Sequence, residues 1–165
     1  MFHIGDELAH FLADALESSC GLPEKMPANL PEGRSDPAFS RAVKVLRGQI
    51  PITLLERHTT HHGPLCTVYC RRVVNSMREK FAATSGSAEI VVEGTASSES
   101  TERLSELSSA LVLSIMQILA EMKGEWGVGG YFGGGWEVHA EPIKSGGLKY
   151  SQTSKVVMSV DIRRY

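Results

Sequence analysis

The stretch AEIVVEGTASSESTERLSELSSALVLSIM, residues 88–116, contains the two elements that decide the fold. Ile90, Val91 and Val92 follow one another without alternation, which predicts a strand at 88–94 that is buried on both faces and central in its sheet. A turn rich in serine and acidic residues follows, and apolar residues then recur at intervals of three and four. This spacing predicts a long amphipathic helix from about Glu99 to Lys123, with a buried stripe of Leu104, Leu107, Leu111, Ile115, Ile118 and Met122.

Shorter periodic segments flank this stretch on both sides. Residues 6–18 place apolar side chains at helical spacing and predict an N-terminal helix. Strands are predicted at 50–57, 67–74, 136–143 and 155–164. The last two alternate, so we expect half-buried antiparallel strands, with Trp136, Val138 and Ala140 on one face. This order predicts a single α+β domain over residues 1–165, in which a mainly antiparallel sheet packs against the long helix and the N-terminal helix.

The composition is that of an ordinary globular protein, with 42% hydrophobic and 22% charged residues and a formal net charge of −2. This balance does not indicate the basic surface on which sequence-independent nucleic-acid binding depends. The first residues lack the basic start and apolar run of a signal peptide, and no apolar run is long enough to cross a bilayer. We therefore expect a cytosolic setting, no membrane contact, and reduced thiols at Cys20, Cys66 and Cys70.

Two connections are unusual in composition. Residues 21–37 are rich in proline and lack periodicity, which predicts a long extended arm. Residues 124–135, GEWGVGGYFGGG, predict a glycine-rich loop that carries Trp126, Tyr131 and Phe132. These aromatic side chains either fold back onto the core or anchor a partner protein, since rigid aromatics are frequent interface hot spots. The glycines do not form a phosphate-binding motif, and we expect no cofactor.

The stretch RHTTHHGPLC, residues 57–66, is the one candidate for a metal site. His58, His61 and His62 lie close together there, and Cys66 and Cys70 follow. On a strand, the two cysteines would be about 13 Å apart, too far for one zinc ion with ligand distances near 2.0–2.3 Å. Two or three histidines on a turn make a weak site, so we interpret the stretch as a polar loop and expect no bound metal.

No arrangement of residues indicates catalysis. Glu137, His139 and Glu141 alternate along one strand face and could hold a general acid and base, but such alternation is typical of a solvated face. The chain is therefore predicted not to be an enzyme. The basic pairs Arg71–Arg72 and Arg163–Arg164 are interpreted as solvated strand faces or as inter-subunit contacts, and they join the aromatic loop residues as candidate interface residues.

The order of elements resembles one family. The strand, acidic turn and long helix of residues 88–116, followed by WEVHAEPIKSGGLKYSQTSKVVMSVDIRRY (136–165) and preceded by the N-terminal helix, are similar to the tail terminator proteins of long-tailed bacteriophages and to related head–tail connection proteins. The resemblance covers residues 4–20 and 50–165. The 21–37 arm and the 124–135 loop depart from it.

This resemblance implies a virion structural protein at the head–tail junction. Such proteins form a homo-oligomeric ring, usually a hexamer, that caps the tail tube, stops its polymerisation and docks to the neck, while DNA passes through the lumen without being read. The implied partners are the chain itself, the tail tube protein and neck proteins. Alternatives are another neck protein (an adaptor or stopper), a non-viral binding module, and a small cytosolic metal protein or enzyme that uses His58, His61 or His62.

Overall fold

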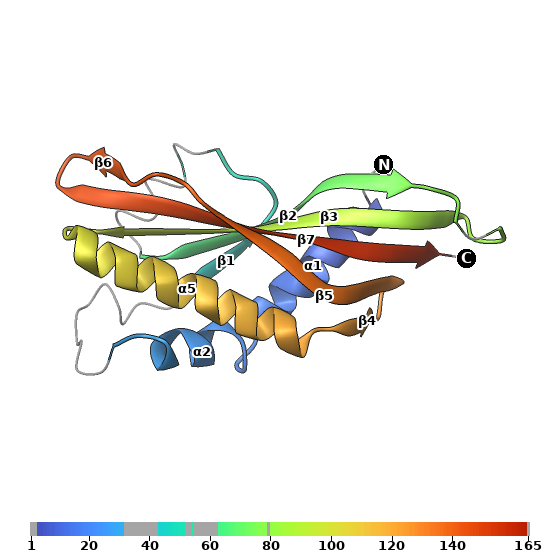
Figure 1. Cartoon of the computed structure of the whole chain (residues 1–165), viewed down its shortest axis with the longest axis horizontal. Helices are drawn as coiled ribbons and strands as arrows, with labels where there is room; N and C mark the ends of the chain where they lie inside the picture. Colours follow the sequence, from blue (N-terminus) through green and yellow to red (C-terminus); the bar gives the residue numbers. More distant parts are fainter. Residues whose placement is uncertain (1–2, 32–42, 52–53, 55–62, 79, 165) are drawn as a thin grey trace.

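A computed structural model describes residues 3–31, 43–51, 54, 63–78 and 80–164, and its centre is a seven-stranded sheet (Figure 1). The strand order is β1-β2-β3-β7-β5-β4, and β6 pairs separately with the beginning of β7. Only β1 and β2 pair in parallel; every other described pair is antiparallel. The strands are β1 (Lys44–Arg47), β2 (Leu65–Asn75), β3 (Thr84–Ser98), β4 (Gly124–Trp126), β5 (Gly130–Ala140), β6 (Lys144–Gly146) and β7 (Lys149–Arg164).

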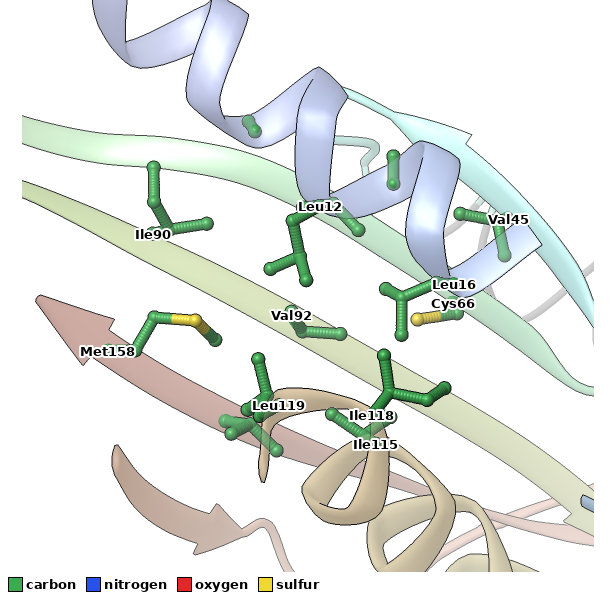
Figure 2. Packing of buried hydrophobic residues seen from close by; sticks show 14 of the residues in the cluster. Leu12, Leu16, Val45, Cys66, Ile90, Val92, Ile115, Ile118, Leu119 and Met158 are labelled. Carbon is green, nitrogen blue, oxygen red and sulfur yellow. The ribbon is translucent and has the colours of Figure 1, made fainter. Parts of the chain in front are cut away.

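Three helices are described, and they cover one face of this sheet, which we call the inner face. They are α1 (His3–Glu17), α2 (Leu22–Ala28) and α5 (Thr101–Glu121). In Figure 2, Leu12 and Leu16 of α1 and Ile115, Ile118 and Leu119 of α5 point toward the same strands, where they meet Ile90, Val92 and Met158. The α+β class and the mainly antiparallel sheet are thus confirmed.

Helix α5 is the predicted long helix, and it lies closely against β3 and β7. Its buried residues include Leu104, Leu107, Leu111 and Ile115. Gly94 of β3 permits the close approach, since a Cβ there would lie 2.6 Å from Leu111 Cδ2. The helix is apolar and long enough to meet a length-and-composition criterion for a membrane span, a criterion that buried core helices also meet.

Strand β3 is central, as the uninterrupted apolar run predicts. It is hydrogen-bonded to β2 on one side and to β7 on the other, and every residue from Val91 to Ser98 is buried. The predicted helix at 6–18 is confirmed as α1, which begins at His3 and ends at Glu17, and the predicted strands at 67–74 and 155–164 are confirmed within β2 and β7.

The prediction of a strand at 50–57 is wrong for the residues of this range that the structure describes. Ile50 and Pro51 belong to no strand, and 52–53 and 55–57 lie outside the described residues. The neighbour of β2 is instead β1, with Val45 opposite Cys66 in parallel register. A parallel pair cannot be closed by a tight turn, so β1 and β2 are not the two strands of a hairpin.

The connections also differ from their predictions. Residues 22–28 form helix α2 rather than an extended arm; Pro23 is tolerated in its first turn, and Leu22 and Met26 are buried. Asn29 fastens the end of α2 to α5, because its amide donates 2.9 Å hydrogen bonds to Ser114 and Gln117. Residues 32–37 of the predicted arm lie outside the described residues. The predicted 124–135 loop instead contains β4, a turn and the beginning of β5.

Candidate assembly surfaces

Two of the three aromatic side chains predicted for an interface belong to the core. The side chain of Trp126 is 2% exposed and stacks on Phe11 of α1, and its Nε1 donates a 2.9 Å hydrogen bond to the Met122 carbonyl. Phe132 is fully buried, with its ring centroid 5.7 Å from that of Trp126. The prediction that Trp126 and Phe132 lie at an interface of the folded chain is therefore wrong. Tyr131 alone of the three is half exposed.

Arg71 and Arg72 lie at a β-bulge in β2, where the register with β3 shifts between Cys70 and Arg72. The Arg71 guanidinium forms an ion pair with Glu89 on β3. This hydrogen bond holds the pKa of Glu89 below its ordinary value. Arg72 is exposed and lies opposite Glu89 in the register. We call the face of the sheet that points away from the helices the outer face. The two arginines make this face basic along β2.

Arg163 and Arg164 tie the end of β7 to its surroundings. Arg164 Nη1 lies 3.1 Å from Glu7 Oε2 of α1, and the Arg163 amide donates a 3.0 Å hydrogen bond to the Gly129 carbonyl in the β4–β5 turn. The Arg163 side chain also lines a surface cavity of about 600 Å³ together with Tyr131, Glu125 and Asp161. Both arginines thus have contacts within the chain.

The thiols do not gather at a metal site. Cys66 is fully buried, and burial raises its pKa to about 12. Cys70 is half-buried and Cys20 is exposed. Among the residues that the structure describes, no three His, Cys, Asp or Glu side chains could hold one metal ion. The predicted polar loop with His58, His61 and His62 lies outside them, so that interpretation remains a prediction.

Glu137, His139 and Glu141 line the outer face near the end of β5. His139 Nε2 lies 3.3 Å from Glu137 Oε2, and both side chains are largely exposed. Glu141 pairs with Lys155 at 3.1 Å, and Lys155 also lies 3.3 Å from the nearly buried Glu93. The sequence did not indicate this network, because Glu93 and Lys155 are distant in sequence and are brought together only by the β3–β7 register.

The inner face of β5 carries an apolar stripe that the described part of the chain leaves partly exposed. We call Trp136, Val138 and Ala140 the β5 stripe; Trp136 is 38% and Val138 36% exposed, and Ala140 is exposed as well. Their register partners on β7 include Met158 and Val156, which are 2% and 0% exposed beneath the helices. The predicted alternation is therefore present, and Trp136 and Val138 are only partly buried, because the described helices pack mainly on β1, β2, β3 and β7.

The sheet has two open stretches of edge in the described part of the chain. Strand β4 pairs with β5 only at 130–132, so residues 136–140 of β5 are paired with β7 on one side only, and 133–135 lie in an irregularity of the β5–β7 register. Strand β1 pairs with β2 only as far as Val68, which leaves 69–75 of β2 similarly open. Unpaired strand edges expose backbone donors and acceptors that readily bind another strand.

Two hairpin turns carry apolar side chains at opposite ends of the molecule (Figure 1). Met77 and Phe81, between β2 and β3, are 60% and 89% exposed. At the other end, Ile143 and Leu148 beside β6 are 44% and 92% exposed. No sequence periodicity indicated these residues, since each is an isolated apolar residue in a polar turn.

Comparison with known proteins leaves these surfaces as the main guide to function. No model of a known protein family matches the chain. No curated protein matches it either.

Proposed function

We propose that this protein is a ring-forming subunit at the head–tail junction of a long-tailed bacteriophage, where it acts as the tail terminator that caps the tail tube. The observation that carries the proposal is the exposed β5 stripe. A tryptophan and a valine on the helix-covered face of a sheet are normally buried, and uncovered apolar patches of this kind mark surfaces that another protein covers. The chain is then one subunit of an assembly.

The apolar turns support a position between two different partners. A ring subunit contacts its neighbours laterally and other components above and below. The β5 stripe is on the side of the sheet, whereas Phe81 and Leu148 are at its two ends, nearly fully exposed. This distribution suits a subunit with lateral contacts to copies of itself and axial contacts to the tail tube and the neck.

The order of the elements supports the tail terminator over other assembly subunits. The N-terminal helix, the central strand followed at once by a long helix, and the two final antiparallel strands are the elements on which the resemblance to tail terminators rests. An adaptor or stopper of the neck would use the same kinds of surface, so the binding partner distinguishes these functions.

The test is to measure the mass of the purified protein and to mix it with polymerising tail tube subunits. We expect a closed oligomer and tubes of defined length with extra density at one end in electron micrographs. Trp136→Glu should abolish both, whereas Tyr131→Glu, a charge added at a similarly exposed position of β5, should preserve them. A protein that stays monomeric and never joins a tube would contradict the proposal, and binding to neck proteins alone would favour an adaptor or stopper.

A further inference from the structure

We infer that neighbouring copies of this chain join through their open sheet edges, with β5 of one copy antiparallel to β2 of the next. The contact places Glu137 opposite Arg72 and Trp136 opposite Val73. This inference rests on the proposed function, because it specifies how the ring subunits contact one another.

The strand directions within one chain already suit this pairing. Strand β2 is antiparallel to β3, β3 to β7, and β7 to β5, so β5 runs opposite to β2. A second copy placed beside the first, with its inner face on the same side, therefore presents β2 antiparallel to β5. The open stretches, 136–140 and 69–75, are five and seven residues long. Two different edges meet, which makes the contact heterologous, and heterologous contacts close into rings when the rotation permits.

Charge complementarity favours a second copy as the partner of this edge. The outer face of the open β5 stretch carries Glu137, whereas Glu141, which follows it, already pairs with Lys155 of its own chain. The corresponding face of the open β2 stretch carries Arg72, beside Arg71, which pairs with Glu89 of its own chain. Opposite charges directly across two strands stabilise their pairing, whereas two like edges of this chain would bring acid to acid or base to base.

One register matches the two faces of the joined sheet at Trp136 and Glu137. Arg72 lies opposite Glu89, and Val73 opposite Ala88, whose side chain is buried on the inner face. Trp136 lies opposite the buried Met158, also on the inner face. Setting Trp136 beside Val73 places Glu137 beside Arg72 on the outer face. A shift by one residue would turn Trp136 toward the outer face of the neighbour.

The neighbouring copy also covers the β5 stripe. In each chain α1 lies over the inner side of β2, where a Cβ on Gly5 would lie 2.4 Å from Cys70 Sγ and 3.0 Å from Val73 Cγ2. A copy joined at β2 therefore brings the beginning of its α1 next to Trp136. The helix layer, which ends short of β5 in the single chain, then continues into the next subunit.

This register also displaces each copy along the strand direction relative to the preceding copy. Trp136 is level with Ile90 of its own chain through Met158, whereas Val73 is level with Ala88 of the neighbour. Successive copies are thus displaced by two residues along the strands, about 7 Å. A closed sheet with such a displacement has strands tilted from the ring axis.

Disulfide cross-linking of the full chain tests this contact. In a Cys20→Ser, Cys70→Ala background, Arg72→Cys combined with Glu137→Cys should give a ladder of disulfide-linked oligomers on mild oxidation, because opposed residues have Cβ atoms about 4.5–5.5 Å apart. The matched control combines Arg72→Cys with Ser109→Cys, an exposed position on α5, and should give no ladder. Circular dichroism confirms that each variant is folded.

Charge reversal provides a second test without new cysteines. Arg72→Glu and Glu137→Arg should each weaken self-association at least about tenfold, and the double variant should restore it to within about threefold. A ring that caps tail tubes, yet neither cross-links at 72 and 137 nor responds to charge reversal, would overturn this inference and leave the proposed function intact. Cross-linked polymers that never cap a tube would support the inference and count against the proposed function.

Discussion

The aromatic rings of Phe11 and Trp126 stack with their centroids 5.4 Å apart, which joins helix α1 to the β4–β5 hairpin. The two residues are far apart in the sequence, and their contact closes the core at one end of the sheet. This position explains why a tryptophan in a glycine-rich segment is structural.

Trp126→Ala is expected to reduce the free energy of unfolding by about 3–5 kcal/mol, since it removes the stacking contact and leaves a cavity. Tyr131→Ala, at the half-exposed neighbouring aromatic, should change it by no more than about 0.5 kcal/mol. Urea unfolding followed by far-ultraviolet circular dichroism measures both. Equal effects of the two substitutions would contradict the core position of Trp126.

The close approach of α5 to β3 makes Gly94 intolerant of a side chain. Gly94→Ala should reduce stability by about 1–3 kcal/mol, because its Cβ would overlap Leu111. Gly127→Ala is the control: a Cβ there meets nothing within 4 Å, so its effect should be small. Thermal unfolding of the two variants in parallel gives the comparison, and a neutral Gly94→Ala would mean that α5 lies farther from the sheet.

The ion pair between Arg71 and Glu89 should make stability depend on acid pH. The hydrogen bond from Arg71 lowers the pKa of Glu89 in the folded state below 4.5, so its stabilisation is present above that value. It is lost as the pH falls through the lowered folded-state pKa. Arg71→Gln should therefore be less stable than the unsubstituted protein at pH 7 and equally stable at strongly acid pH.

Unfolding midpoints measured across this pH range at low protein concentration test the point. Lys123→Gln removes an exposed positive charge elsewhere and should show no such convergence. A stability difference for Arg71→Gln that is constant down to strongly acid pH would show that the arginine acts by packing rather than by its charge.

The cysteines should differ sharply in reactivity. The thiolate is the reactive form, and burial raises the pKa of Cys66 to about 12, so its thiol stays protonated and shielded near neutral pH. Exposed Cys20 should be alkylated rapidly by iodoacetamide, and Cys66 only as fast as the protein unfolds. Peptide mapping by mass spectrometry follows each site, and Cys20→Ser should eliminate the fast phase. Rapid labelling of Cys66 in the native protein would contradict its buried position.

The elements with long, single-period patterns could be predicted from the sequence. The leucine spacing of α5 and the continuous Ile90–Val92 run reflect burial within one chain, and the folded chain satisfies both. Strand β1 could not be predicted in this way, because four residues paired in parallel with a distant partner leave no local periodicity. Helix α2 was obscured by Pro23 and Pro27, although its docking depends on Met26 and Asn29.

Surfaces were harder to predict than elements. Alternation at 136–140 identifies an apolar face, but it does not reveal whether a helix of the same chain covers that face. For the aromatic residues among the glycines, the interface prediction was wrong, since Trp126 stacks on Phe11 of α1 and Phe132 packs against Trp126. In both cases burial depends on packing between elements that are distant in sequence.

The long register between β3 and β7 bears on how the protein is made in the cell. It pairs Thr84 with Arg164 and Ser98 with Tyr150, so β3 cannot complete its hydrogen bonding until the ribosome has synthesised β7. Until then, the edge of β3 that pairs with β7 is unpaired and is exposed to other nascent chains and to chaperones. The complete sheet can therefore form only after β7 has left the ribosome.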